Sequence, residues 1–464
     1  MSPGEILQLI RAASEHQRAG RFDAAAMNCR RVLAQAPNNS DALWILGISA
    51  RQQGRLDEAA EMLRRWVSLN PGKAEPHGML GDIYRAQGKF DLAIEQYSAV
   101  IRLKPDLSAG YLNLGRALHA QGKLPDAIAA YQKSIQLKPD WAEAHESLGN
   151  ALLETGRIDD AIAAFTQALQ FKPGLAGAEW GLGKIYVSQG RNDDALACYQ
   201  RAAKANPANA NAHFFLGCRL IKADRPDEAA SEFREAIRLK PDSPDWKYQL
   251  AAITGDRSIK TAPAQYVRNL FDLYAPRFDQ HLVEKLNYRT PALLLEQVLQ
   301  ATEKREFDIL DLGCGTGLCG VQFRPYARRL VGVDLSPEMI KRAELRKIYN
   351  ELAAADLMTS LNAAVEQYDL ILASDVLVYV GDLSEFMPAA AKSLRGGGLL
   401  ACSIEDYASE GFILHQAERF AHSIEYFRRL ATASGLKEVS ASKVVLRKNK
   451  QVDVFGWTIV AIKA

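Results

Sequence analysis

Apolar and polar residues along the first half of the chain follow helical periodicity, in short units that repeat. Proline recurs every 34 residues between positions 37 and 241, and two ladders of glycine keep the same interval. Alanine follows in phase from Ala25 to Ala229. Chance does not produce such regularity, so the pattern predicts about seven helix-turn-helix units over residues 6–241, closed by a helix in "DSPDWKYQLAAI".

Each repeated position has a physical role in such a unit. Gly81 and its equivalents fall inside the first helix, where a missing side chain lets the second helix approach closely. The second glycine suits a left-handed cap, and the proline ends the second helix. The segment resembles the tetratricopeptide repeat, which implies an α-superhelix whose first helices line a concave groove. A protein or peptide partner is therefore expected in that groove.

Phase within the repeat identifies the side chains expected to line the groove. They are Trp44, Leu112, Arg116, Trp180, Lys184 and Phe214. The aromatic and apolar members suit the apolar anchors of a peptide, whereas the repeated Lys and Asn that would grip a terminal carboxylate are missing. The alternative is that the aromatic side chains only pack against neighbouring repeats. A repeat array carries no chemistry of its own.

The pattern changes in the second half of the chain. From Phe307 onward, short apolar runs alternate with amphipathic stretches, as in a parallel sheet covered by helices. Strands are expected at residues 307–312, 330–334, 350–355, 368–373 and 397–403, followed by a hairpin of residues 437–446 and 452–462. Seven such strands predict an open, doubly wound, Rossmann-like sheet. Its ligand is expected at the carboxyl ends of the strands, where the strand order reverses.

The first of these strands runs directly into three glycines, in "FDILDLGCGTGL". Gly313, Gly315 and Gly317 let the backbone approach a ligand that a Cβ would push away. The loop lacks the Gly-Lys-Ser/Thr ending of a phosphate-binding P-loop, and its third glycine comes too early for a dinucleotide loop. Asp311, directly ahead of the loop, would repel a pyrophosphate but attract an amine or a sulfonium.

Carboxylates also end the next strands. Asp334 ends the second strand, at the separation where an acid meets ribose hydroxyls, and Asp356 ends the third, where a carboxylate can accept from the adenine amine. Ser374 and Asp375 follow the fourth strand. Residues 265–464 thereby resemble the class I S-adenosylmethionine-dependent methyltransferases. The whole chain is similar to a group of bacterial predicted methyltransferases that carry tetratricopeptide repeats.

The resemblance implies S-adenosyl-L-methionine as the cofactor and a set of residues that hold it. By position these are Asp311, Gly313, Cys314, Gly315, Gly317, Asp334, Leu335, Asp356, Leu357, Ser374, Asp375 and Tyr274. Asp311 and the glycine loop would line the methionine moiety, Asp334 the ribose and Asp356 the adenine. No metal is expected, because the six cysteines form no C-x-x-C pair and the acids form no magnesium cluster.

Methyl transfer from a sulfonium is an in-line displacement, so the protein mainly aligns donor and acceptor and excludes water. A base is needed only where the acceptor carries a proton at working pH. By position, the residues near the acceptor are Asp375, Tyr379, His415, Arg419 and His422. Tyr379 and His422 are the catalytic candidates. The plain alternatives are that Tyr379 packs under the cofactor and that His422 is a structural residue beside the helix cap at Ser423.

Composition narrows the remaining possibilities. A net charge of +2 gives no electrostatic reason to expect nucleic acid as a partner. No apolar run approaches the length of a membrane span, and the start of the chain lacks the pattern of a signal peptide. With cysteines scattered along the chain, these features predict a cytoplasmic protein and leave homo-oligomerisation open.

The sequence divides into a repeat array over residues 1–250, a linker and helical cap over 251–300, and a methyltransferase domain over 301–464. The favoured function is methyl transfer by an enzyme whose repeats recruit a protein substrate or partner. One alternative is a small-metabolite methyltransferase that uses the repeats for self-association. Another is a non-enzymatic repeat adaptor, against which the intact glycine loop and strand-end acids speak.

Overall fold

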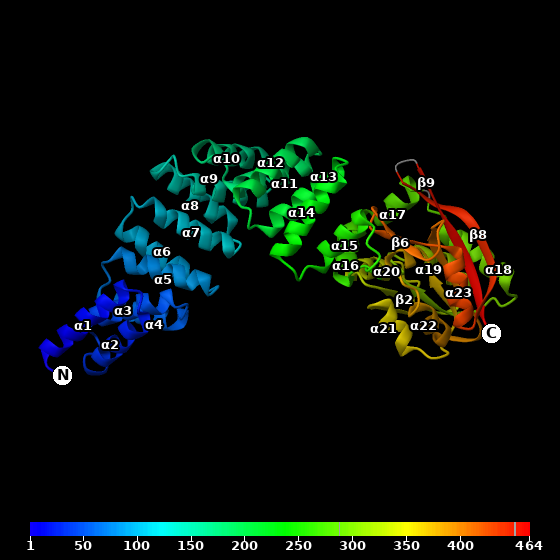
Figure 1. Cartoon of the computed structure of the whole chain (residues 1–464), viewed down its shortest axis with the longest axis horizontal. Helices are drawn as coiled ribbons and strands as arrows, with labels where there is room; N and C mark the ends of the chain where they lie inside the picture. Colours follow the sequence, from blue (N-terminus) through cyan, green and yellow to red (C-terminus); the bar gives the residue numbers. More distant parts are fainter. Residues whose placement is uncertain (287, 450–451) are drawn as a thin grey trace. The chain divides into compact units, whose positions relative to one another are not determined.

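The computed structural model describes residues 1–286, 288–449 and 452–464. The chain forms two compact units, Met1–Ala223 and Asp224–Ala464. Figure 1 shows the first unit as successive helices and the second as a sheet with helices around it. The predicted fold class, a helical repeat superhelix followed by a Rossmann-like sheet, is confirmed.

The first unit consists of antiparallel helix pairs joined by tight turns. Its helices are α1 (Pro3–Arg18), α2 (Phe22–Gln35), α3 (Ser40–Gln52), α4 (Leu56–Leu69), α5 (Ala74–Ala86), α6 (Phe90–Leu103), α7 (Ser108–Ala120), α8 (Leu124–Leu137), α9 (Ala142–Glu154), α10 (Ile158–Phe171), α11 (Ala176–Ser188), α12 (Asn192–Ala205) and α13 (Ala210–Lys222). The turn glycines take the left-handed conformation expected of them, as Gly122 does at φ +80°. Over the whole described part of the chain, no helix is long and apolar enough to cross a membrane.

The glycine inside the first helix of a pair allows an aromatic ring of the second helix to lie against the backbone. A Cβ added at Gly115 would lie 2.5 Å from Cε1 of Tyr131, and one added at Gly149 would lie 2.7 Å from Cε1 of Phe165. Both rings are buried. The glycine ladder is thus the complement of a ladder of rings, which explains why both keep the period of the repeat.

The second unit begins with helices that lead into the sheet. These are α14 (Pro226–Leu239), α15 (Pro244–Thr254), α16 (Ala264–Tyr274), η1 (Ala275–Arg277), α17 (Phe278–Gln280), η2 (His281–Lys285) and α18 (Thr290–Ala301). Tyr248 in α15 is fully buried, and its hydroxyl donates to the carbonyl of Glu418 at 2.8 Å. Its ring lies 6.2 Å from that of Phe420. The helix expected to close the repeat array is therefore packed on the second unit.

Strands and helices alternate through the rest of the second unit. The strands are β1 (Phe307–Leu312), β2 (Ala327–Asp334), β3 (Glu351–Ala354), β4 (Tyr368–Ala373), β5 (Leu394–Asp406), β6 (Phe412–His415), β7 (Arg419–His422), β8 (Leu436–Asn449) and β9 (Val452–Lys463). The intervening helices are α19 (Leu318–Phe323), η3 (Arg324–Tyr326), α20 (Pro337–Leu345), α21 (Leu357–Ala363), η4 (Leu377–Tyr379), α22 (Phe386–Ser393) and α23 (Ile424–Ala433). Each predicted strand is present. The short hairpin of β6 and β7 was not predicted.

The sheet has the topology of a doubly wound fold. Strands β3, β2, β1, β4 and β5 lie side by side in that order and run parallel, with β9 antiparallel to β5 and β8 antiparallel to β9. The strand order reverses between β1 and β4, which is where ligands of such sheets bind. Strand β7 pairs with the last two residues of β5. This pairing places the β6–β7 hairpin at the carboxyl edge of the sheet, where β5 ends.

Apolar side chains cover both faces of the sheet. Leu310 and Ile371 belong to the core cluster on one face, together with Phe386 and Phe427 from α22 and α23. Their neighbours along the strands, such as Ile309 and Leu372, belong to the cluster on the other face, with α18 and α19. Strands β1 and β4 are buried along their whole length because helices cover both faces. This rigid centre fixes the position of the loops at its carboxyl edge.

The ladder of glycines and rings makes a testable prediction. The substitution Gly115→Ala should lower the free energy of unfolding by about 1–3 kcal/mol, because the added methyl group must displace the Tyr131 ring. Gly78→Ala is the matched control, since its nearest neighbour would be 3.8 Å away and alanine is favoured over glycine in helices by roughly 1 kcal/mol. In chemical denaturation followed by circular dichroism, the midpoint should fall for Gly115→Ala and rise for Gly78→Ala, relative to the wild-type protein. A more stable Gly115→Ala protein would contradict this account.

Candidate functional site

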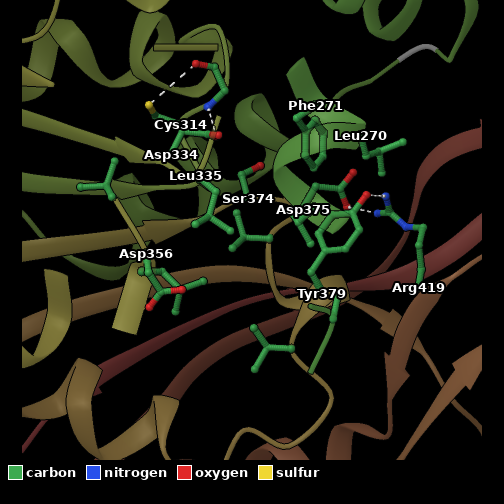
Figure 2. A pocket seen from close by; sticks show the side chains of 18 of the residues that line it. Leu270, Phe271, Cys314, Asp334, Leu335, Asp356, Ser374, Asp375, Tyr379 and Arg419 are labelled. Atoms are coloured by element: carbon green, nitrogen blue, oxygen red, sulfur yellow. Dashed lines mark hydrogen bonds and ion pairs between the residues drawn. The ribbon is translucent and has the colours of Figure 1, made fainter. Parts of the chain in front are cut away.

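A cavity of about 540 Å³ opens at the carboxyl edge of the sheet, within the second unit. Figure 2 shows Asp334, Leu335 and Asp356 on one side of it and Tyr379 and Arg419 on the other. The residues after β1, β2, β3 and β4 form its floor, and side chains of α16 and α17 form part of its cover. Its size is that of pockets which enclose small organic ligands and cofactors.

The glycine loop after β1 needs glycine for its backbone conformation. Gly313, Gly315 and Gly317 have φ of +61°, +56° and +94°. A Cβ at Gly313 would lie 2.3 Å from Cγ2 of Val376, and one at Gly317 would lie 3.1 Å from Cδ of Arg346. A Cβ at Gly315 would make ordinary contact with the Phe278 ring, 3.6 Å from its Cε1, so the left-handed φ is what favours glycine there. Gly313, Cys314 and Gly315 line the cavity.

The carboxylate of Asp334 fixes this loop to the end of β2. Its Oδ2 accepts a hydrogen bond from the backbone N–H of Gly315 at 2.9 Å, and its Oδ1 accepts one from Ser336 at 2.8 Å. Burial raises the pKa of Asp334, while the two N–H groups oppose the rise by stabilising the anion. Because each carboxylate oxygen can accept more than one hydrogen bond, the group can still bind a ligand in the cavity that it lines.

Asp311 lies beneath the loop and does not line the cavity. Its Oδ2 accepts a hydrogen bond from the hydroxyl of Tyr349 at 2.6 Å, and only 1% of the residue is exposed. Burial, aided by the charge of Asp334, raises the pKa of Asp311 to about 7. Its contact with the methionine moiety of a cofactor, expected from the sequence, therefore stays a prediction, since any influence must pass through the loop above it.

Asp356 has two roles available to it. Its Oδ1 caps α21 by accepting from the backbone N–H groups of Met358 and Thr359, at 2.8 and 3.1 Å. In the described part of the chain, Oδ2 has no hydrogen-bond partner. Leu335 and Leu357 line the cavity beside Asp356, so this end combines apolar walls with a carboxylate. That combination suits an aromatic base with an exocyclic amine.

Helices α16 and α17 are fastened over the glycine loop. The Ser336 hydroxyl donates to Asp272 of α16 at 2.5 Å, and Arg346 binds Asp279 of α17 at 2.5 Å. Thr316, inside the loop, also donates to Asp279. The rings of Phe271, Tyr274 and Phe278 line the cavity from this side. Of these three rings, the sequence named Tyr274 as a cofactor-binding residue and placed Phe278 in the covering segment, but it did not name Phe271.

Ser374 and Asp375 follow β4 and lie at the middle of the cavity (Figure 2). The Ser374 hydroxyl forms a hydrogen bond with the hydroxyl of Tyr288 at 2.7 Å. Asp375 has a left-handed backbone, at φ +62°, and its N–H donates to Ser403 at 2.9 Å. Aspartate adopts such a backbone more readily than most residues other than glycine. Tyr288 carried no signal in the sequence.

A network of charges stands behind Asp375. Glu405 binds both Arg419 and Arg447 through the same oxygen, each at 2.6 Å. Oδ1 of Asp375 lies 3.3 Å from Arg419 and 3.7 Å from Arg447. Sequence reasoning named Arg419 but missed Glu405 and Arg447, because Arg447 follows the expected end of its strand and the expected hairpin turn begins there.

Tyr379 lies on the cavity wall, under the ring of Phe271 at a centroid distance of 5.5 Å. Its hydroxyl accepts a hydrogen bond from Arg419 at 3.4 Å. Burial raises the pKa of Tyr379, although Arg419 opposes the rise. The phenol is therefore neutral at physiological pH, and its position favours a packing and hydrogen-bonding role over that of a base.

His422 does not line the cavity, which corrects the expectation that it could reach the acceptor. Its Nε2 donates to the carbonyls of Val380 and Gly381, at 2.8 and 3.0 Å, and none of the residue is exposed. Burial lowers the pKa of His422 to about 4. The side chain is thus a neutral structural group that holds β7 against the loop after β4. His415 is exposed on β6 and likewise lies outside the cavity lining.

The residues expected to line the repeat groove differ in what they can contact. Leu112 is 1% exposed and belongs to the core between helices, so it offers no surface to a partner. Trp44 packs against Trp66 with a centroid distance of 5.4 Å. Trp180 lies 4.8 Å from Phe215, whose ring also contacts Phe214. Lys184 is exposed and Arg116 is partly exposed, so both remain available to a partner.

Comparison with known families agrees with both units. The family model described as "Methyltransferase domain" matches residues 310–402, from the middle of β1 into β5. The family model described as "Cilia and flagella-associated protein 70 C-terminal domain", a tetratricopeptide repeat family, matches residues 7–269. The fold and the site define a class I methyltransferase domain joined to tetratricopeptide repeats. The chain belongs to the repeat family, whose model covers more than half of its length.

Curated relatives resemble only part of the chain. A ubiquinone biosynthesis O-methyltransferase of Cereibacter sphaeroides is 33% identical over 98 residues, which are 20% of this chain and 40% of that protein. The human methyltransferase-like protein 27 is 37% identical over 92 residues, which are 19% of this chain and 37% of that protein. The chain therefore spans about 40% of the length of the curated relatives that it matches.

Solved structures resemble the repeat architecture. The crystal structure of the MamA protein is 28% identical, with a TM-score of 0.36, and the match covers 37% of this chain and 93% of that one. A tetratricopeptide repeat protein from Parabacteroides merdae is 18% identical, with a TM-score of 0.45, and the match covers 54% of this chain and 99% of that one. These similarities concern the fold alone.

The buried His422 makes a prediction about stability and pH. Folding lowers the pKa of His422 from 6.5 to about 4, because the fold favours the neutral imidazole. Above pH 6.5 the side chain is neutral in both the folded and the unfolded protein, and its contribution to the stability of the fold is at its full value. That contribution is lost as the pH falls toward 4, by about 2 kcal/mol between pH 7 and pH 5. His422→Gln, which stays neutral, should remove this dependence. Denaturation at both pH values measures the difference between the two proteins, and an equal difference at both would contradict the assignment.

Proposed function

We propose that the second unit transfers a methyl group from S-adenosyl-L-methionine. The observation that carries the proposal is the cavity at the switch point, with a glycine loop flanked by the carboxylates of Asp334 and Asp356. A sulfonium and an ammonium, both carried by this cofactor, are favoured beside carboxylates. The absence of a Cβ at Gly315, which lines the cavity beside the Phe278 ring, lets a ligand lie against the backbone.

The residues fit the cofactor part by part. Asp334 would accept the ribose hydroxyls, and the unpartnered Oδ2 of Asp356 would accept the adenine amine between Leu335 and Leu357. The loop around Cys314 would hold the methionine moiety, over Asp311. When bound, the cofactor supplies an activated methyl group on a positively charged sulfur. We propose further that residues 251–300 are a linker and cap, whose aromatic side chains exclude water from this region.

The protein's part in the reaction is mainly alignment. Holding donor and acceptor in line can supply roughly 7–11 kcal/mol of the barrier, so no elaborate catalytic group is required. Tyr379, fixed between Phe271 and Arg419, would shape the space for the acceptor. Because α16 and α17 are bound to Ser336 and Arg346, this cover would have to open before the spent cofactor could leave and a new one enter.

The first unit is proposed to recruit a protein, either as the methyl acceptor or as a docking partner. The support is its repeat architecture, which is a binding scaffold by default, and its exposed Lys184 and aromatic cluster around Trp180. The six thiols are all free, which suits a reducing compartment such as the cytoplasm. A small-metabolite acceptor is the second candidate, because the curated relatives include O-methyltransferases of ubiquinone biosynthesis.

Asp334→Ala tests the cofactor site. Loss of a buried charged acceptor should weaken the binding of S-adenosylhomocysteine by roughly 1.5–3 kcal/mol. Part of that loss would come from the freed N–H of Gly315. Calorimetric titration gives the affinity. Asp308→Asn is the control, because Asp308 is a buried acid of β1 that pairs with Arg328 and is absent from the cavity lining. Unchanged affinity in Asp334→Ala would refute the assignment.

The recruiting role is tested by reversing one exposed charge. Cell extract is incubated with labelled methyl donor and with either wild-type protein or Lys184→Glu. If the groove recruits the acceptor, Lys184→Glu should lower protein labelling by roughly tenfold while cofactor affinity stays the same. Lys133→Glu makes the same charge change on exposed α8 and serves as the control. Labelling confined to small molecules, and equal in all three proteins, would favour the metabolite alternative.

A further inference from the structure

The end of the cavity opposite Asp334 and Asp356 holds polar groups that the cofactor contacts leave without a role. Asp375, Tyr379 and Arg419 meet there (Figure 2). They come from the segment after β4 and from β7, on the side of the sheet opposite β2 and β3. Since the proposed cofactor extends over the ends of β1, β2 and β3, this opposite end is where a methyl acceptor would enter.

Asp375 is the group at this end that lies next to the glycine loop. The following residue, Val376, touches that loop so closely that a Cβ at Gly313 would lie 2.3 Å from its Cγ2. Asp375 itself lines the cavity. It therefore stands between the part of the loop assigned to the methionine moiety and the end assigned to the acceptor, which is where the methyl group would be transferred.

The structure fixes the orientation of this carboxylate. Its backbone is held at φ +62° by a hydrogen bond from its N–H to Ser403. Oδ1 is buried without a hydrogen bond and lies 3.3 Å from Nη2 of Arg419 and 3.7 Å from Nη1 of Arg447, and both arginines bind Glu405. Over the residues that the structure describes, Oδ2 has no hydrogen-bond partner. Figure 2 shows one oxygen turned toward Arg419 and the other turned away from it.

The charged side chains around Asp375 indicate the chemical class of the methyl acceptor. The nearby cations are Lys260, Arg419 and Arg447, and the nearby carboxylates are Asp375, Asp382, Glu385 and Glu405. Three cations facing four carboxylates leave one negative charge in excess. Each cation is already within 3 Å of a carboxylate, Lys260 of Asp382 and both arginines of Glu405. A carboxylate or phosphate on the reacting group would compete with Asp375 for Nη2 of Arg419 and Nη1 of Arg447, which face Oδ1 without forming a hydrogen bond, whereas an O–H or N–H donor would find Oδ2 of Asp375.

We propose that Asp375 is a catalytic residue whose Oδ2 accepts the proton of the nucleophile, and that the methyl acceptor is consequently a hydroxyl or an amine. This inference rests on the proposed methyltransferase function. The lone pair of the acceptor oxygen or nitrogen forms the bond to the methyl carbon as the carbon–sulfur bond breaks. The electron pair of that bond returns to sulfur, which becomes a neutral thioether, and the proton of the acceptor passes to Oδ2. Arg419 and Arg447 are positioning residues that act through Oδ1.

Binding of two cofactor analogues tests the position of Asp375 without knowledge of the acceptor. Sinefungin carries a primary ammonium on carbon in place of the methyl sulfonium, whereas S-adenosylhomocysteine has a neutral sulfur there. Wild-type protein should bind sinefungin roughly tenfold or more tightly than S-adenosylhomocysteine, because the ammonium can donate to Oδ2. Asp375→Asn should remove this preference. Asparagine tolerates a positive φ, so the loop is expected to keep its conformation.

Asp356→Asn is the matched control for this titration, because it should weaken both analogues by the same factor and leave their ratio unchanged. A ratio that is the same in wild type and Asp375→Asn would overturn the role of Asp375 while leaving the proposed function intact. Failure of S-adenosylhomocysteine itself to bind wild-type protein would instead overturn the proposed function and this inference with it. Calorimetry distinguishes the two failures in a single experiment.

The class of acceptor is tested on the labelled product formed from cell extract. Methyl ethers and methylamines withstand mild alkali, whereas methyl esters of carboxylates release volatile methanol. Base-stable label that Asp375→Asn fails to produce supports the inference, and retention of the product on a cation exchanger at acidic pH separates amines from ethers. Label released as methanol would overturn it. So would equal labelling by wild type and Asp375→Asn, since general-base catalysis contributes roughly 10²–10⁴-fold.

Discussion

The hydrogen bond from the N–H of Gly315 to the carboxylate of Asp334 is the constraint on which the site depends. It ties the loop after β1 to the end of β2 at a place where both groups are withdrawn from water. A buried carboxylate is favourable only with such partners, and a left-handed glycine loop is held in one conformation only by such anchors. The same bond therefore satisfies the charge and shapes the cavity floor.

Other parts of the site are arranged around this anchored loop. The N–H of Ser336 also donates to Asp334, and its hydroxyl donates a hydrogen bond to Asp272 in the covering helix α16. Thr316, one residue after Gly315, donates to Asp279 in α17. The cover and the floor thus share one hydrogen-bonded chain. Under the proposed function, a change in the loop conformation on cofactor binding would be transmitted to the cover through these hydrogen bonds.

The sequence predicted the features whose cause is local. The glycines, the strand-end acids and the helix cap at Ser423 act within a few residues of themselves, and the cap does accept from the N–H of Tyr426. The short apolar runs that predict the strands are likewise recognised from residues that are neighbours in the chain. The repeat and the places of the main strands could therefore be named from residue types and spacing, whereas the candidate cofactor residues came from the resemblance to class I methyltransferases and stay a prediction.

Contacts between distant segments escaped the sequence. Tyr288 reaches Ser374 across 86 positions, and Arg447 joins Glu405 across 42. The hairpin of β6 and β7 has four-residue strands with little alternation, so it had no periodic signal. Leu112 was assigned to a surface because repeat phase gives the face of a helix but not how deeply a neighbouring repeat covers it. These errors share one cause, since packing between segments determines burial.

The arrangement of charges shows how the two ends of the cavity differ. Burying two guanidinium groups beside one carboxylate is unfavourable unless a further anion compensates for them. Asp375 is that anion, and its distances of 3.3 and 3.7 Å from the arginines mean that it is attracted without being fully bonded. Such a carboxylate keeps one oxygen turned to the cations, which leaves the other oxygen for the cavity. At the opposite end, backbone N–H groups donate to Asp334 and to Oδ1 of Asp356 instead. Fixed dipoles hold the carboxylates assigned to binding, whereas side-chain cations hold the carboxylate that would take up a proton.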